Sequence, residues 1–188
     1  MKLQLNYLLG ICLFTIFFCI VSCSEDTPLV NESELITTLE FVLKTQNGSD
    51  SIVFSFKDLD GDGGNPPVII SPKLKSNTNY LTSLKLLNES SAPIVNITEE
   101  IISEGTEHQF FYTPTGQANL QFTYLDFDTN TYPVGTKTNM ATGNPGTGIL
   151  KINLKHLPDK KASGVQNGDI TNSGGETDIE LTFDIVVE

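Results

Sequence analysis

Apolar and polar residues alternate with a period of two along most of the chain after residue 35, which is the pattern of half-buried β-strands. The last segment shows this pattern best: one face carries Ile179, Leu181, Phe183, Ile185 and Val187, and the other carries Asp178, Glu180, Thr182 and Asp184. Similar alternation predicts strands near 39–44, 52–57, 108–113, 119–125 and 150–156, with weaker ones at 67–71, 81–87 and 93–97.

Glycine, proline and asparagine separate these short segments, and Pro114 with Gly116 predicts a hairpin between 108–113 and 119–125. Only 97–104 offers a helical turn, which its β-branched isoleucines disfavour. We therefore expect an all-β fold, an antiparallel immunoglobulin-like β-sandwich of about 7–9 strands. A closed β-barrel is the alternative.

The first 22 residues differ, because Lys2 precedes an uncharged, largely apolar segment at 8–21. As a helix this segment would be about 21 Å long, short of the ~30 Å hydrocarbon core of a membrane. We interpret 1–22 as an export signal. The following IVSC, ending at Cys23, resembles the lipobox of bacterial lipoprotein precursors, which implies that Cys23 is the lipidated mature N-terminus. An ordinary signal with an incidental cysteine is the alternative.

Cys23 is the only cysteine that would remain after removal of the signal, so the mature chain has no intrachain disulfide and no cysteine-based zinc site. Residues 23–35 are polar and acidic and predict a tether, and 36–188 predict a single domain. The net charge is -12 and the chain has no arginine. This composition excludes nucleic acid as a partner, whereas it suits divalent cations and keeps a tethered domain soluble.

Two acidic segments follow predicted strands and are candidate calcium loops. FSFKDLDGDGG, 54–64, places Asp58, Asp60 and Asp62 at alternate positions, and YLDFDTN, 124–130, does the same with Asp126, Asp128 and Asn130. If the loops share one end of the sandwich, they could share one ion. The first is no EF-hand, because Ile69 stands where the bidentate glutamate belongs. The alternative for both is a turn in which Asp and Asn cap their own backbone.

Other chemistry is sparse. His108 and His156 are candidate ligands for a metal or a haem iron, and structural histidines are the alternative. The chain lacks the motifs of nucleophilic serine, phosphate-binding and zinc-hydrolase sites, so we expect no enzyme. The connection 157–177, long for a β-protein, predicts either a partner contact or a disordered flap.

The lipobox, the acidic SED at 24–26, the strand ending 54–64 and GDITNSGGETDIELTFDI at 168–185 together resemble cell-surface lipoproteins of the Bacteroidota. The resemblance implies a lipid anchor in the outer membrane and exposure at the cell surface, with the periplasmic face as the alternative. Our leading hypothesis is an envelope binding protein with a protein partner or an extracellular ligand, with Ca²⁺ stiffening one loop. The alternatives are a metal or haem scavenger that works with a TonB-dependent transporter, and a structural envelope component.

Overall fold

The computed structural model describes residues 35–188 except 47, 49–50 and 62–63. The predicted signal, Cys23 and Asp62 therefore lie outside the described residues. Within the described part, the strands are β1 (Thr38–Thr45), β2 (Ser51–Lys57), β3 (Val68–Ile70), β4 (Asn79–Asn88), β5 (Val95–Asn96), β6 (His108–Gly116), β7 (Gln121–Tyr124), β8 (Lys137–Ala141), β9 (Gly146–His156) and β10 (Glu176–Val187). The helical elements are α1 (Ile97–Ser103) and two 3₁₀ turns, η2 (Val165–Asn167) and η3 (Ile170–Asn172).

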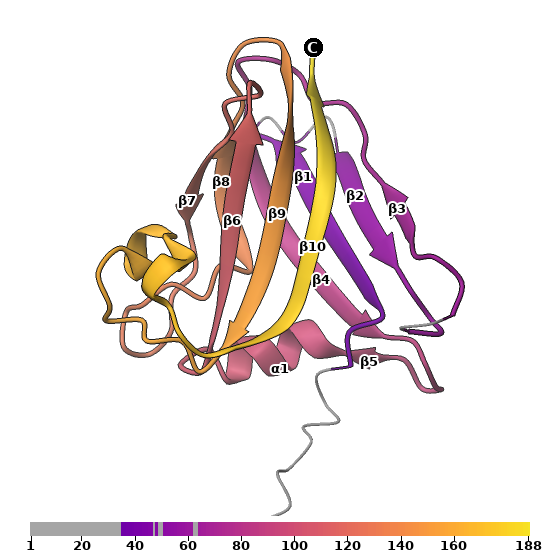
Figure 1. Ribbon diagram of the computed structural model, residues 1–188, viewed down its shortest axis with the longest axis vertical. Helices are drawn as coiled ribbons and strands as arrows, with labels where there is room; N and C mark the ends of the chain where they lie inside the picture. The colour runs from indigo at the N-terminus through magenta and orange to yellow at the C-terminus, as the bar shows by residue number, and fades with distance from the viewer. Residues whose placement is uncertain (1–34, 47, 49–50, 62–63) are drawn as a thin grey trace, which may run out of the picture. The chain divides into compact units, whose positions relative to one another are not determined.

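The strands form two antiparallel sheets that face each other (Figure 1). The larger sheet has the order β3-β2-β1-β4-β8-β7, with β5 paired to the end of β4, and the smaller has the order β10-β9-β6. The antiparallel β-sandwich is confirmed, and the described strands do not close into a barrel. The structure has one strand more than the upper end of the expected range: strands were expected at 67–71, 93–97 and 119–125, where β3, β5 and β7 lie, but none was expected at β8, Lys137–Ala141.

The core lies between the sheets, where the inward residues of every long strand meet. The period-two prediction for β10 is confirmed, since Leu181, Phe183, Ile185 and Val187 are all buried. They pack against residues of the larger sheet that include Phe41 and Phe54. Burial of one face per strand fixes the register, because a slip by one residue would expose the whole apolar set.

The predicted hairpin between 108–113 and 119–125 is wrong. β6 pairs with β9 in the smaller sheet, whereas β7 pairs with β8 in the larger one. The chain crosses between the layers at 117–120, where Ala118 and Leu120 enter the core. The N–H groups of Gln117 and Ala118 both donate to the carbonyl of Thr147, which replaces the hydrogen bonds of a hairpin turn.

Helix α1 lies across one end of the sandwich, the α1 end, where β2, β4, β7 and β9 finish and β6 begins (Figure 1). Ile97 and Ile101 are one turn apart on the same helix face, and both are almost completely buried. Burial of this face outweighs the low helix propensity of isoleucine, which is why a full helix forms where the sequence favoured none.

The connection between β9 and β10 is ordered and packed, so the disordered-flap alternative is wrong. Val165 of η2 is completely buried, and its carbonyl accepts a hydrogen bond from the side chain of Gln109 on β6. Phe111, on the outward side of β6, is also completely buried. The connection therefore belongs to the folded body of the domain.

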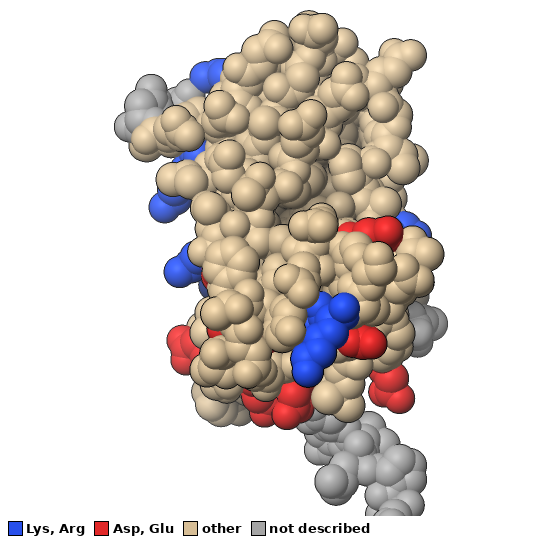
Figure 2. Space-filling model, turned by 90° about the vertical axis from the view of Figure 1, so that its left-hand side faces the viewer, with Lys and Arg blue, Asp and Glu red and all other residues tan. Residues whose placement is uncertain are grey.

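Charged side chains are distributed unevenly over the face that carries β7 and this connection. Figure 2 shows that they gather in its lower half, toward the α1 end, and are scarce in its upper half. The sequence explains this, because 112–125 and 138–150 contain no charged residue. The electrostatic potential of this face is therefore concentrated toward the α1 end.

Two tyrosine hydroxyls join β6 to β7 and to the β7–β8 loop, and they give a spectroscopic test of the packing. One is that of Tyr112 on β6, which donates to the carbonyl of Gly135. Tyr124 donates to the carbonyl of Phe110, and burial raises the pKa of Tyr124 to about 12 from the ordinary 10.0. The unfolded chain ionises first, so the free energy of unfolding is expected to fall as the pH rises from 10.0 to about 12. Ultraviolet titration of tyrosinate should show a step near pH 12 that Tyr124→Phe removes, while Tyr112, whose pKa burial raises well above its ordinary value, still ionises late; an unchanged curve in that variant would contradict the assignment.

Candidate functional site

The α1 end is open on the side of β10, and this opening is the candidate site. β10 is an edge strand whose only described strand partner is β9. At its far end, the segment beside Leu74 closes the edge through bonds to Val186 and Glu188 and a bridge to Val187. Toward Asp178 no described strand covers it.

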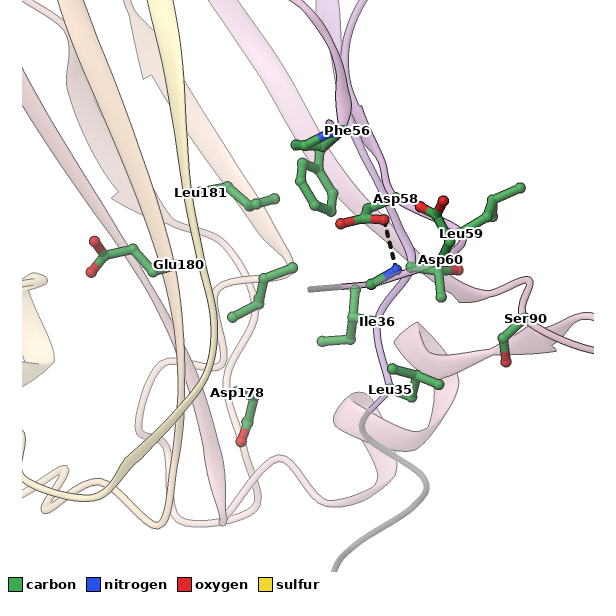
Figure 3. Close-up of a pocket in the computed structure, with 14 residues that line it drawn as sticks. Leu35, Ile36, Phe56, Asp58, Leu59, Asp60, Ser90, Asp178, Glu180 and Leu181 are labelled. Atoms are coloured by element: carbon green, nitrogen blue, oxygen red, sulfur yellow. Dashed lines mark hydrogen bonds between the residues drawn. The ribbon is translucent and has the colours of Figure 1, made fainter. Parts of the chain in front are cut away.

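A groove of about 790 Å³ fills this opening between the two sheets (Figure 3). Its apolar walls are Ile36, just before β1, and Phe56 of β2 on one side, and Ile179 and Leu181 of β10 on the other. Two carboxylates, Asp58 and Asp60, stand on its rim; Asp178 also lines it, whereas the Glu180 side chain points away and pairs with Lys151 at 2.8 Å. None of the described lining residues is a lysine, arginine or histidine. An apolar interior with an acidic margin suits a ligand that is both apolar and cationic.

The first predicted calcium loop forms the rim of this groove as a self-capped turn. Asp58 accepts a hydrogen bond from the N–H of Gly61, and Asp60 accepts two from the N–H and side-chain amide of Asn65. Gly64 lies against the Asp60 carboxylate, leaving no room for a Cβ. The described carboxylates thus make the contacts expected of turn chemistry. Asp62 is outside the described residues.

The hydrogen bonds from Asn65 to the Asp60 carboxylate can be tested by pH titration. The backbone N–H of Asn65, followed by its side chain, holds the pKa of Asp60 below its ordinary 3.8. Stability from this bond is therefore complete above pH 3.8 and is lost as the pH falls through the lower folded-state value. NMR titration should find a pKa below 3.8 for the Asp60 carboxyl. In Asn65→Ala, which keeps the backbone donor, this pKa should rise part of the way back toward its ordinary value. No difference between the two proteins would contradict this role.

The second predicted calcium loop is a structural junction. Asp126 accepts hydrogen bonds from the N–H groups of Gly135, Thr136 and Lys137, and also from the Thr136 hydroxyl. Four donors saturate this carboxylate and hold the start of β8. Asn130 contributes its N–H to Asp128, so its described contact is also a turn bond.

Asp128 already holds a cation, the ammonium group of Lys160. Its carboxylate lies 3.0 Å from the Lys160 Nζ, and both side chains are almost completely buried. The same ammonium donates to the carbonyls of Gly105 and Pro133, so three oxygens surround it. Lys160 thereby fastens the 157–175 connection to the β7–β8 loop and to the turn after α1.

The two acidic loops do not share an ion. β2 and β7 both finish at the α1 end, but β1, β4 and β8 lie between them. At ~4.8 Å per strand spacing they are about 19 Å apart. A carboxylate on one loop therefore cannot reach a cation held by the other.

The two histidines, distant in sequence, meet directly. His108 and His156 are register partners on β6 and β9, and their rings stack with centroids 4.8 Å apart and planes 8° apart. His108 Nε2 lies 3.8 Å from an oxygen of Asp178, and His156 Nε2 lies 3.8 Å from one of Glu107. Asp178 connects this pair to the groove, since it also lines the groove.

The stacked geometry limits what the pair can bind as it stands. Ring nitrogens coordinate a metal in the ring plane, and two nearly parallel planes do not converge on one ion. Among the described residues, no group of three or more His, Cys, Asp or Glu side chains is placed to hold a metal. A ring would have to rotate before both histidines could ligate the same ion.

Sequence reasoning missed two features of this region. Asp178 was expected on the solvent face of its strand, but its side chain is only 5% exposed because a bulge between Thr177 and Ile179 shifts the register of β10. Lys160 lies in the connection 157–177, where nothing in the sequence indicated a buried charge. The GG pair at 174–175, just before β10, is the only sequence signal of irregular backbone near the bulge.

In the part of the chain that the structure describes, no helix is long and apolar enough to cross a membrane. Comparison of the chain with protein-family models, with curated proteins and with solved structures found no significant match. We therefore infer a function from the groove at the open edge of β10.

Proposed function

We propose that this protein is a lipid-anchored, extracytoplasmic binding protein of the bacterial envelope, which captures an envelope protein or an extracellular ligand in the groove beside β10. The observation that carries the proposal is the groove itself, about 790 Å³ in volume, with an apolar interior and an acidic margin. Phe56 and Leu181 in its walls belong to β2 and β10, two strands that pack against the core, which favours a preformed site.

The position of the tether supports this proposal. The groove is lined by Leu35, the last residue of the predicted tether, and by Ile36, which follows it. A chain from Cys23 to Leu35 reaches at most about 40 Å when extended. A lipid on Cys23 would thus keep the groove within that distance of the outer membrane, where a membrane-bound partner presents its segments.

Site-specific photocrosslinking in cells tests the binding function. A benzoylphenylalanine at Leu59, on the rim, is expected to give a defined adduct, and the same residue at Val53, on the outer face of β2, is not. Equal labelling at both sites, or none at Leu59, would dismiss the groove as a binding site.

The anchor has its own test. Mass spectrometry of the protein purified from membranes is expected to find acyl chains on Cys23, and Cys23→Ser is expected to move the protein to the soluble fraction. Two or three acyl chains bind membranes firmly, at about 0.8 kcal/mol per buried methylene. An unmodified Cys23 in the native protein would remove the anchor from the proposal.

Calcium remains a proposal for the first loop alone, at the rim. If an ion stiffens this loop, the melting temperature will be higher in calcium than in chelator, and Asp60→Ala will abolish the difference. Equal melting in both conditions would end the proposal, because the turn bonds to Gly61 and Asn65 then suffice.

A second candidate, metal or haem scavenging in concert with a TonB-dependent transporter, is favoured by the contact between His108 and His156. It predicts tight stoichiometric zinc binding or a haem band that shifts on mixing, either one lost in the double variant His108→Ala with His156→Ala. An unchanged spectrum together with no heat of zinc binding would reject it. A purely structural envelope component would show neither these responses nor the Leu59 adduct.

A further inference from the structure

Building on the proposed binding function, we propose that the groove takes an extended, lysine- or arginine-bearing segment of a partner protein, which adds to the smaller sheet as a strand beside β10. This is recognition by β-augmentation: backbone hydrogen bonds bind the segment, and pockets for alternate side chains select it. The partner is defined by its chemistry, an extended cationic peptide.

The backbone of β10 is oriented for this addition. The carbonyl of Val186 accepts from the N–H of Leu74, and the N–H of Glu188 donates to the carbonyl of Leu74. Backbone groups of a strand alternate in direction with a period of two, so those of Thr182 and Glu180 face the same edge. The chain thus covers one end of this edge with its own segment and leaves the other end beside the groove.

The space matches a short strand. The regular stretch of β10 that follows the bulge, from Ile179 to Thr182, is about 13 Å long at ~3.3 Å per residue, which accommodates about four residues of an added strand. Alternate side chains of that strand would point between the sheets, toward Ile36, Phe56 and Leu181, and the others would point toward solvent. The inward positions therefore select apolar side chains.

Charge distinguishes three possible occupants of the groove: a second copy of this chain, its own tether, and a cationic segment of a partner. Asp58 and Asp60 stand on the rim opposite β10, and no described lining residue is a cation. A second copy of this chain carries a net charge of -12, and the tether residues 24–34 include four acids and no lysine. Both occupants would be repelled, whereas a cationic segment would be attracted.

Fluorescence anisotropy with the purified protein tests the mode of binding. The probe is a labelled hexapeptide of alternating valine and lysine, compared with the same peptide methylated at alternate backbone nitrogens on the edge that faces β10. The unmodified peptide is expected to bind at least about tenfold more tightly, because methylation removes the donors that pair with β10. A valine–glutamate peptide is expected not to bind.

Matched protein variants test the charge. Asp58→Asn combined with Asp60→Asn keeps an acceptor oxygen on each side chain, so the turn is retained while two charges are lost, and affinity is expected to fall about fivefold at low salt. Asp184→Asn removes one charge from the outward face of β10 and is expected to change affinity less than twofold, about the effect of a distant screened charge. Circular dichroism of each variant establishes that it is folded.

The outcomes separate the two proposals. Equal affinity for methylated and unmodified peptides, or no binding of either, would overturn strand addition, and a Leu59 adduct in cells would still support the groove as a binding site. Loss of affinity in Asp184→Asn equal to that in the Asp58 and Asp60 double variant would overturn the rim as the source of cation selectivity.

Discussion

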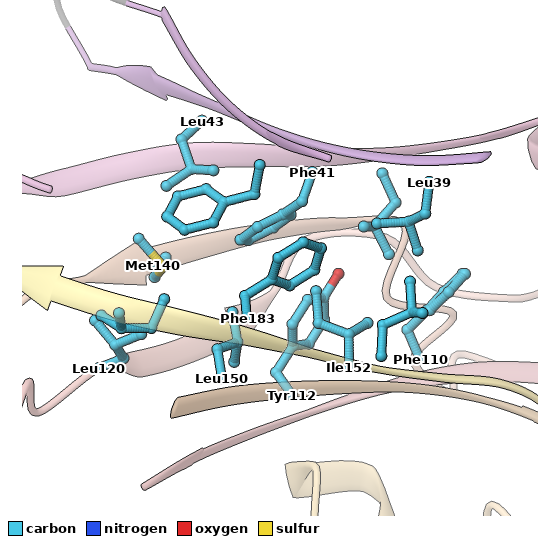
Figure 4. Packing of buried hydrophobic residues seen from close by; sticks show 14 of the residues in the cluster. Leu39, Phe41, Leu43, Phe110, Tyr112, Leu120, Met140, Leu150, Ile152 and Phe183 are labelled. Atoms are coloured by element: carbon cyan, nitrogen blue, oxygen red, sulfur yellow. The ribbon is translucent and has the colours of Figure 1, made fainter. Parts of the chain in front are cut away.

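Phe183→Ala is expected to lower the free energy of unfolding by about 3–5 kcal/mol, the range for an aromatic side chain deleted from a packed core. Phe183 is completely buried on β10, and its ring meets that of Phe54 on β2 edge to face, with centroids 5.7 Å apart. Figure 4 shows it projecting from the smaller sheet toward Phe41 of the larger one. The deletion would leave a cavity at the contact between the layers, beside the groove.

Urea denaturation of the variant measures this loss, and Val186→Ala supplies the control. Val186 lies on the same strand but on its outward side, with 37% of its surface exposed, so its truncation is expected to cost less than about 1 kcal/mol. Similar midpoints for the two variants would show that β10 does not hold the layers together. That result would also contradict our proposal that the groove is a preformed site.

The fold was largely predictable because burial of one strand face leaves a period-two record in the sequence. Leu150, Ile152 and Leu154 alternate with polar residues along β9, and all three are completely buried. Such a pattern does not indicate which strand lies next to it in the sheet. β6 and β7 have similar alternation and are separated by only four residues, 117–120, yet they belong to different sheets. Strand pairing depends on how the inward faces of all the strands pack into one core, and local sequence does not encode this.

The site was less predictable for the same reason. The groove joins residues near 36 and 56–61 to residues 178–181, and it exists because one part of the β10 edge is uncovered. The aspartates at 58 and 60 were found by their spacing, but their position opposite Ile179 was not. The meeting of His108 with His156 follows from strand register, which no single segment reveals.

Lys160→Met is expected to cost about 3–5 kcal/mol of unfolding free energy, because it leaves the carboxylate of Asp128 buried without its cation. The Lys160 and Asp128 side chains are 5% and 1% exposed, so the carboxylate would be left without its cation and largely shielded from water. Burial lowers the pKa of Lys160, and hydrogen bonding and attraction to Asp128 oppose that shift. The ion pair with Asp128 therefore stabilises the charged form of Lys160 at a position where burial alone would disfavour it.

Lys161→Met is the matched control, since this neighbouring lysine is exposed, and it is expected to leave stability unchanged within about 0.5 kcal/mol. The double variant Asp128→Asn with Lys160→Met is expected to recover part of the loss, because no unpaired charge is then buried. Hydrogen exchange should show faster opening of 157–175 in Lys160→Met alone. Wild-type midpoints and exchange rates in that variant would mean that the connection is held by Val165 and Gln109 instead, and that the buried cation is dispensable.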